Sequence, residues 1–212
     1  DLGLAFDGDG DRVLMVTSSG DIVDGDQLLY IIVANECVQN KIKGGVVGTL
    51  MTNLAMEEAL KEKNIPFLRS NVGDRYVSEM MDDNNWIYGG ENSGHVLNLE
   101  YASTGDGIVA GLQVIAAMLR ANMSLSAINA GFKKFPQRLI NVKFSAGSQN
   151  PLLDKQVIEA VEEAEKAMDG TGRVLLRKSG TEPLIRVMVE AQSKEDSDKW
   201  SEFIAQQVKN VK

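Results

Sequence analysis

The sequence LGLAFDGDGDRVLMV, residues 2–16, contains the loop from which we interpret the rest of the chain. Two short apolar runs, typical of buried strands, flank a polar loop in which three aspartates alternate with two glycines before an arginine. These side chains are Asp7, Asp9, Asp11 and Arg12. Alternate residues on an extended strand lie about 6–7 Å apart, which is too wide for three carboxylates to hold one ion. Because glycine permits a tight turn, we expect the loop to bring the carboxylates together.

The donor atoms of this loop indicate what it binds. Carboxylate oxygens with no His or Cys nearby favour Mg²⁺ or Ca²⁺ over zinc. The forked guanidinium of Arg12 suits a phosphate oxygen beside the ion. We therefore predict a metal site at Asp7, Asp9 and Asp11, with Arg12 next to it.

Two other interpretations of the loop are a plain surface turn and an EF-hand loop. A run rich in Asp and Gly also occurs in plain surface turns, and this alternative stays open. An EF-hand loop fits less well, because its sixth position requires Gly and is Arg12 here, and its twelfth requires Glu and is Ser18. The flanking runs also predict strands, whereas an EF-hand has helices there.

The composition narrows the class of protein. The chain has 212 residues, of which 43% are hydrophobic and 25% charged, as is usual for globular proteins. A net charge of -8 argues against nucleic acid or an anionic membrane as partner. The longest apolar run, Leu28–Ala34, is far shorter than the roughly 20 residues of a membrane span. A single cysteine, Cys37, excludes a disulfide framework and favours a cytoplasmic location.

The order of strands and helices predicts two folds in succession. Apolar strands alternate with amphipathic helices in the first part of the chain, which indicates an α/β domain with a largely parallel sheet. One of its helices is expected from about Gln27 with Asp26 as its cap, and another from about Tyr76. After a linker at residues 133–136, the pattern indicates a small α+β domain with an antiparallel sheet.

The predicted domains are 1–22, the remnant of a preceding domain that carries the metal loop; 23–133, the α/β domain; and 137–212, the α+β domain. Residues 2–6 already read as a strand that needs neighbours on both sides. We therefore expect this chain to be the C-terminal part of a longer protein.

Three further polar segments are candidates for binding. Residues 71–75 (NVGDR) lie at the C-terminal end of a predicted strand, where α/β sheets place ligand loops. Residues 89–95 (GGENSGH) surround polar side chains with glycines, and these side chains suit hydroxyl and phosphate groups. Residues 177–183 (RKSGTEP), with Arg186 beyond them, combine cations, hydroxyls and a glycine into a predicted anion site. The simpler alternatives are a helix cap for residues 71–75, a structural histidine for residues 89–95 and a basic hairpin turn for residues 177–183.

Together, DGDGDR, GGENSGH and RKSGTEP resemble the α-D-phosphohexomutase superfamily over the whole chain. VGDRYV at 72–77 and SGTEPLIRVMVE at 179–190 are most similar to its phosphoglucosamine mutase branch. The resemblance implies the end of domain 2 followed by domains 3 and 4 of a four-domain enzyme. It also implies an isomerase that interconverts glucosamine 6-phosphate and glucosamine 1-phosphate through a phosphoserine, for cell-wall precursors.

The resemblance also implies roles for individual residues. Mg²⁺ would be held by Asp7, Asp9 and Asp11, while Arg12, Asp74 and Arg75 would be catalytic. Sugar hydroxyls would be bound by Glu91 and Ser93, with His95 near them. The non-reacting phosphate would be bound by Arg177, Ser179, Gly180, Thr181 and Arg186. A glucose- or glucosamine-1,6-bisphosphate would serve as primer and intermediate.

One family feature is not found. Members carry the phosphorylated serine in an Ala-Ser-His-Asn-Pro-type loop upstream of the metal loop. The nearest match here, GSQNP at 147–151, lacks the His and lies downstream, so we do not assign Ser148 as nucleophile. We expect the serine in a preceding part of the protein, and expect this chain alone to be inactive.

Some alternatives remain. A phosphomannomutase or phosphoglucomutase of the same superfamily is one, and a non-catalytic phosphosugar-binding module is another. The expected partners are a phosphosugar and the N-terminal domains of the same protein, with a homodimer left open and neither nucleic acid nor membrane expected.

Overall fold

The computed structural model describes residues 1–39, 41–144, 150–179 and 182–211. It divides into two compact units, residues 1–134 and 135–212. The break falls in the predicted linker. The finer division of the first unit at residue 22 stays a prediction.

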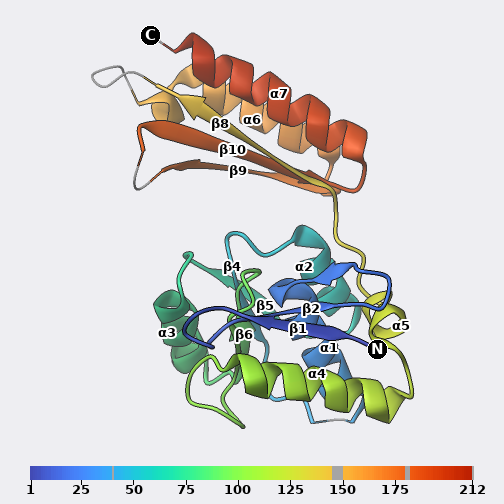
Figure 1. Ribbon diagram of the computed structural model, residues 1–212. Coiled ribbons are helices and arrows are strands. Elements are labelled where there is room, and N and C mark those ends of the chain that lie inside the picture. Colours follow the sequence, from blue (N-terminus) through green and yellow to red (C-terminus); the bar gives the residue numbers. More distant parts are fainter. Residues whose placement is uncertain (40, 145–149, 180–181, 212) are drawn as a thin grey trace. The chain divides into compact units, whose positions relative to one another are not determined.

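The first unit contains a small antiparallel sheet and a larger mixed sheet (Figure 1). Its strands are β1 (Gly3–Phe6), β2 (Val13–Val16), β3 (Ile22–Val23), β4 (Val46–Thr49), β5 (Phe67–Ser70), β6 (Tyr88–Gly90) and β7 (Val96–Asn98). Its helices are α1 (Gly25–Val38), α2 (Leu54–Glu62), α3 (Asp74–Asn84), α4 (Gly107–Ala121) and α5 (Leu125–Asn129). The small sheet has the order β1-β2-β3 and the larger one β5-β4-β6-β7. Strand β4 runs parallel to β5 and β6, and β7 runs antiparallel to β6. The predicted α/β fold is thereby confirmed.

Two consecutive glycines of β6 show how helices cover this sheet. A Cβ at Gly89 would lie 2.5 Å from Met81 Sδ of α3, whereas one at Gly90 would approach Leu29 of α1. Because neighbouring residues of a strand face opposite sides, α3 and α1 cover opposite faces. The buried centre between sheet and helices includes Val47, Val77, Met81 and Leu97.

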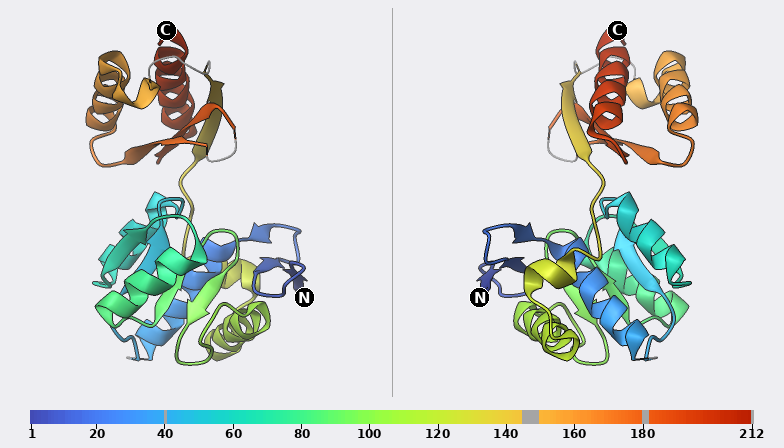
Figure 2. Two further views of the ribbon diagram at one scale, coloured as in Figure 1. Left: turned by 90° about the vertical axis from the view of Figure 1, so that its left-hand side faces the viewer. Right: turned by 90° about the vertical axis from the view of Figure 1, so that its right-hand side faces the viewer.

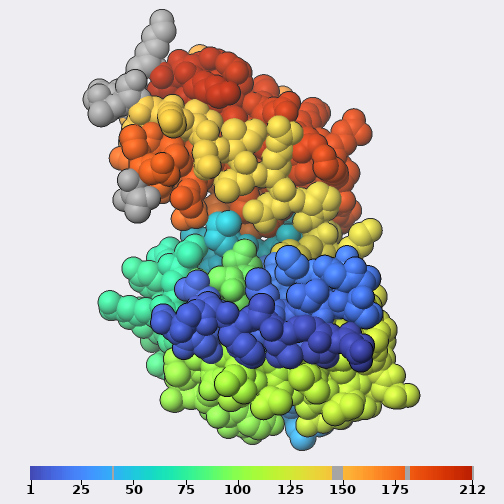
Figure 3. Space-filling model, in the orientation of Figure 1, coloured from blue at the N-terminus to red at the C-terminus, as the bar shows by residue number. Residues whose placement is uncertain are grey.

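Strand β1 differs from the sequence prediction. It was expected to be buried, yet Leu4 and Phe6 are 39% and 46% exposed. Among the described residues β1 pairs with β2 alone, so in this chain it forms an edge of its sheet, and Figure 3 shows its dark blue residues on the surface of the first unit. A short apolar run has the same pattern in a central and in an edge strand, so the run alone does not decide between them.

The start of α1 also differs from the prediction. Asp24, not Asp26, is the cap: its side chain accepts from Gln27 N, and the Gln27 side chain accepts in return from Asp24 N. This reciprocal arrangement is a capping box. Asp26 lies inside the first turn, is 2% exposed and accepts a hydrogen bond from Asn53 N at 2.9 Å. Its carboxylate therefore joins the starts of α1 and α2.

The second unit is the expected α+β domain. Its elements are β8 (Gln137–Lys143), the short 3-10 helix η1 (Pro151–Leu153), α6 (Lys155–Met168), β9 (Gly172–Lys178), β10 (Leu184–Ala191) and α7 (Lys194–Asn210). The sheet order is β8-β10-β9 and both pairings are antiparallel. Figure 2 shows α6 and α7 side by side against one face of this sheet. The core between this sheet and the two helices includes Ile185, Val187 and Trp200.

Among the described residues, none of the helices combines the length and the hydrophobicity that a bilayer span requires.

Candidate functional site

The DGDGDR loop connects β1 to β2 and is closed by its first aspartate. Asp7 Oδ1 accepts hydrogen bonds from Gly10 N at 3.0 Å and from Arg12 N at 3.3 Å. Gly10 has φ +73°, a left-handed conformation that glycine adopts without strain. The Arg12 guanidinium lies 3.8 Å from Asp7 Oδ2, and both side chains are partly exposed. The predicted tight turn is therefore present.

Asp11 is the member of the loop that turns inward. Its Oδ2 lies 3.1 Å from Nδ1 of His95, whose side chain is 4% exposed. Desolvation raises the pKa of Asp11, but hydrogen bonds with Asp7 and His95 outweigh it, so that pKa lies below its usual value. The other oxygen, Oδ1, is buried and has no hydrogen-bond partner in the described part of the chain. This oxygen is therefore left as an acceptor without a donor among these residues.

Main-chain hydrogen bonds attach the GGENSGH segment to β2, at the end of the DGDGDR loop, and to α1. Val13 N donates to Gly94 O at 3.1 Å, and Gly25 N donates to Asn92 O at 3.1 Å. Gly94 has φ +100°, and a Cβ there would lie 2.4 Å from Val13 O. The segment therefore has a fixed position beside β2. The backbone of the DGDGDR loop is held in turn by a bond from Gly107 N to Gly10 O at 2.9 Å.

Glu91 connects this segment to the residues around 71–75. Its Oε1 accepts from Gly73 N at 3.0 Å, and Glu91 is 8% exposed, whereas Ser93 is exposed. Gly73 precedes α3, which begins at Asp74, two residues earlier than predicted. Asp74 and Arg75 are thus exposed residues of the first helical turn rather than of a loop.

Arg75 is bound to its own helix. Its Nε donates to Glu79 Oε1 at 2.7 Å, and this hydrogen bond is the main reason why the pKa of Arg75 is raised. The guanidinium is therefore charged, exposed and held near the start of α3.

A divalent cation is the group that the sequence implies here. In the part of the chain that the structure describes, no three His, Cys, Asp or Glu side chains are grouped closely enough to hold a metal. The expected gathering of Asp7, Asp9 and Asp11 is therefore not present in this structure. The donor chemistry nevertheless fits a hard cation, since the loop offers carboxylate oxygens and Asp11 Oδ1 is a buried acceptor with no partner in the described ranges.

In the second unit, two arginines face each other across neighbouring strands. Arg186 of β10 is the register partner of Arg177 of β9. Arg186 alternates with Ile185 and Val187 of the core, so both arginines lie on the sheet face away from α6 and α7. Burial, followed by the charge of Arg186, lowers the pKa of Arg177. Arg186 Nε is buried without a hydrogen-bond partner among the described residues.

This pair has the character of an anion site. Like charges directly opposite each other destabilise an antiparallel pair, and an anion between them would remove that repulsion. Ser179 is 7% exposed at the end of β9, and its N donates to Leu184 O at 2.9 Å. The predicted phosphate ligands Gly180 and Thr181 lie outside the described residues, as does Ser148.

Gly105 was missed by the sequence analysis. A Cβ on it would lie 2.3 Å from Cε1 of His95, so the imidazole packs directly on this glycine. The run Thr104-Gly105-Asp106-Gly107 predicts only the start of a helix. Its glycines are the one local sign of a close approach.

Comparison with known families gives a match to most of this chain. The description "Phosphoglucomutase/phosphomannomutase, alpha/beta/alpha domain III" matches residues 24–135, and the C-terminal domain of the same family matches residues 139–207. The chain belongs to the phosphoglucomutase/phosphomannomutase family.

Curated relatives in this family are similar at high identity. Phosphoglucosamine mutase of Pseudoalteromonas atlantica is 59% identical over 211 residues, and that of Klebsiella pneumoniae is 55% identical. Each match covers 100% of this chain and 47% of the relative. The chain therefore spans about half the length of the curated relatives it matches.

Solved structures confirm the fold. An N-acetylphosphoglucosamine mutase of Aspergillus fumigatus has a TM-score of 0.82 at 19% identity, covering 99% of this chain and 48% of that one. A second structure from that organism, in complex with GlcNAc-6P and magnesium, has a TM-score of 0.78 at 21% identity, covering 99% of this chain and 52% of that one.

Proposed function

We propose that this chain is the C-terminal half of a phosphoglucosamine mutase, which interconverts glucosamine 6-phosphate and glucosamine 1-phosphate through a 1,6-bisphosphate. The observation that carries the proposal is the opposed pair Arg177 and Arg186, in a family member 59% identical to a phosphoglucosamine mutase. The Nε of Arg186 is buried and has no hydrogen-bond partner among the described residues. A pair of this kind suits the phosphate that does not react, since two forked cations can bind several phosphate oxygens.

The first unit would supply the reacting side of the site. Glu91 and Ser93 offer acceptors and a donor for sugar hydroxyls, and His95 lies in the same segment. Arg12 would stabilise the charge of the phosphoryl group in transfer. Asp74 and Arg75, at the start of α3, are proposed to position the substrate and to assist proton transfer.

Asp7, Asp9 and Asp11 are proposed to hold Mg²⁺. This accords with their oxygen donors and with Asp11 Oδ1, which has no hydrogen-bond partner in the described part of the chain. When bound, the cation would neutralise charge on a phosphoryl group in transfer. The hydrogen bond between Asp11 and His95 would keep one carboxylate oxygen turned away from the cation and the other toward it.

The proposal includes partners and a location. The phosphoserine is proposed to lie in the preceding half of the protein, since this chain covers 47% of its relatives and the only similar run is GSQNP at 147–151. A glucose- or glucosamine-1,6-bisphosphate would prime the cycle. A cytoplasmic location is proposed from the single cysteine and the phosphorylated substrate, and the homodimer remains open.

Activity of the full-length protein tests this proposal. We expect it to convert glucosamine 6-phosphate with Mg²⁺ and a 1,6-bisphosphate primer, with a higher kcat/KM than for mannose or glucose 6-phosphate. The 212-residue chain alone should show no turnover. A preference for another hexose phosphate would refute the substrate assignment, and turnover by the isolated chain would refute the location of the serine.

The phosphate site can be tested separately on the isolated chain. Replacing Arg177 by Ala should weaken phosphate binding by roughly ten- to hundred-fold, because a charge-assisted hydrogen bond typically contributes about 1.5–3 kcal/mol. The amide signal of Ser179 should move on titration with phosphate, and Arg138→Ala, a surface arginine of the same unit, serves as control. Phosphate binding that is unchanged by Arg177→Ala would contradict the assignment.

A further inference from the structure

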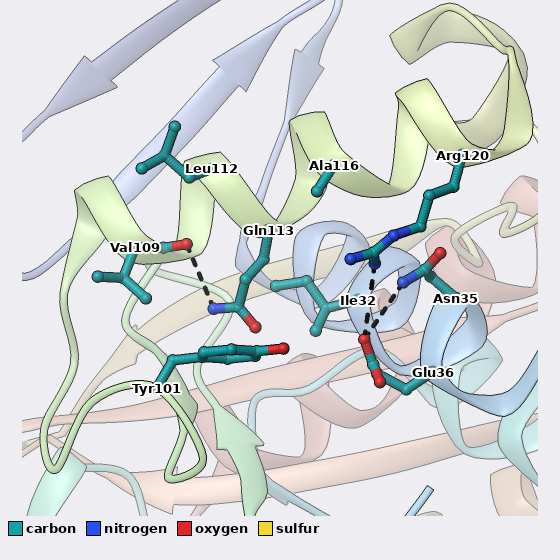
Figure 4. Close-up of a pocket in the computed structure, with 9 residues that line it drawn as sticks. All are labelled: Ile32, Asn35, Glu36, Tyr101, Val109, Leu112, Gln113, Ala116 and Arg120. Carbon is teal, nitrogen blue, oxygen red and sulfur yellow. Dashed lines mark hydrogen bonds and ion pairs between the residues drawn. The ribbon is translucent and has the colours of Figure 1, made fainter. Parts of the chain in front are cut away.

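A cavity between α1 and α4 is separate from the loops described above. Its volume is about 370 Å³, within the range of small-molecule sites. Helix α1 contributes Ile32, Asn35 and Glu36, the segment after β7 contributes Tyr101, and the remaining lining residues Val109, Leu112, Gln113, Ala116 and Arg120 belong to α4 (Figure 4). None of them belongs to the proposed mutase site.

One end of the cavity is charged. The Glu36 side chain is only 7% exposed, and its Oε1 lies 3.9 Å from Nη1 of Arg120, a distance too long for a hydrogen bond. Asn35 Nδ2 donates to the same oxygen at 3.3 Å. A buried carboxylate is costly unless closely paired and hydrogen-bonded. The Glu36 carboxylate can therefore accept a shorter hydrogen bond from a better donor. The half-exposed Arg120 guanidinium can likewise donate to a further acceptor.

The other end of the cavity is apolar and preformed. Figure 4 shows the Tyr101 ring lying beneath Gln113, with Val109 and Leu112 on the side away from Glu36. The amide of Gln113 is already bonded, since its Oε1 accepts from Asn98 at 2.7 Å and its Nε2 donates to Val109 O at 3.3 Å. Gln113 is neutral, and these two hydrogen bonds hold its side chain in place as part of the cavity wall.

We propose that this cavity binds a small zwitterion with an apolar side chain, of the α-amino-acid class. Its ammonium group would donate to Glu36 and its carboxylate would accept from Arg120, so the ligand would separate the loose pair and satisfy both charges. Its side chain would lie against Ile32, Leu112 and Ala116. A ligand with only one charge would leave one of the two protein charges without its new partner.

Titration of the isotope-labelled 212-residue chain with three probes tests the proposal by NMR. Leucine carries both charges, leucinamide lacks the carboxylate and 4-methylpentanoate lacks the ammonium group. Leucine should give saturable shifts at Asn35, Gln113 and Ala116, and the two analogues should bind about tenfold more weakly or worse, because each loses a charge-assisted hydrogen bond.

Two variants identify which charge binds which group. Arg120→Gln should remove the preference for leucine over leucinamide, and Glu36→Gln should remove the preference over 4-methylpentanoate. Lys43→Gln is the control, since Lys43 pairs with Glu100 outside the cavity and its loss should change neither preference. Arg120 is half exposed, so its variant is expected to fold and decides the question even if Glu36→Gln does not fold.

The absence of saturable shifts at the cavity residues up to about 20 mM leucine, above the millimolar range of weak binding, would overturn the proposal. Equal binding of all three probes would overturn it as well, because it would indicate an apolar cavity without charge recognition.

Discussion

Replacing Tyr88 by Phe should stabilise the first unit, and increasingly so at alkaline pH. Tyr88 is fully buried in β6, and its hydroxyl has no hydrogen-bond partner in the described residues. A buried polar group without a partner destabilises a protein by about 1–3 kcal/mol. Removing the hydroxyl should recover the lower end of that range, about 1 kcal/mol at neutral pH, since a small void is left behind.

The pH dependence follows from the ionisation of this hydroxyl. Burial, followed by the negative charges of Glu36 and Glu100, raises the pKa of Tyr88 from 10.0 to about 12. Below pH 10 the hydroxyl is neutral in both states, whereas between pH 10 and 12 the unfolded chain ionises first, which favours unfolding. The free energy of unfolding falls by about 1.4 kcal/mol near pH 11, and the decrease approaches roughly 2.7 kcal/mol above pH 12. Tyr88→Phe has no ionisable hydroxyl at this position, so its folding stability does not fall in this way.

Urea unfolding followed by circular dichroism, with the transition of each unit fitted separately, measures the difference. The advantage of Tyr88→Phe should grow from about 1 kcal/mol at neutral pH to about 2.4 kcal/mol near pH 11. Tyr101→Phe is the matched control, since Tyr101 is 56% exposed and its change should stay within about 0.5 kcal/mol. The reasoning fails if Tyr88→Phe destabilises the unit at neutral pH, or if its advantage is the same at both pH values.

Three further predictions concern the site and its support. Gly105→Ala should displace the His95 ring and destabilise the first unit by about 1–3 kcal/mol, whereas Gly8→Ala, which has open space around it, should not. Because His95 is the only histidine in the sequence, its imidazole NMR signal reports the displacement directly, and an unchanged signal would contradict the contact. Asp24→Ala should cost about 1 kcal/mol through loss of the capping box of α1, and unchanged urea unfolding of the first unit would argue against that role. Arg186→Met should leave the second unit at least as stable in anion-free buffer, while phosphate should raise its Tm less than that of the unmodified chain, and an equal rise in both would contradict the anion site.

The sequence predicted well those features that depend on local patterns. Alternating apolar and polar residues located most strands and helices, and the glycines of DGDGDR indicated a turn that does form around Asp7. The cap of α1 was misassigned although the pattern Asp24-x-x-Gln27 was available, because the nearer Asp26 fitted the simpler rule.

Features that depend on long-range contacts could not be predicted in this way. The bond between Asp11 and His95 joins residues that are 84 positions apart, and spacing alone does not bring them together. The pairing of Arg177 with Arg186 depends on the register of the β9–β10 hairpin, which alternation of side chains leaves undetermined.

The main-chain bond from Gly25 to Asn92 has a consequence for how this family can diversify. The bond uses the carbonyl of residue 92 and makes no demand on its side chain. A Cβ at Gly25, by contrast, would lie 2.0 Å from the carbonyl oxygen of Glu91. Substitutions at position 92 can therefore change the side chain of this segment while the backbone around it stays in place, whereas any side chain at position 25 would collide with the Glu91 carbonyl. Variation within the family is therefore expected at 92 and not at 25.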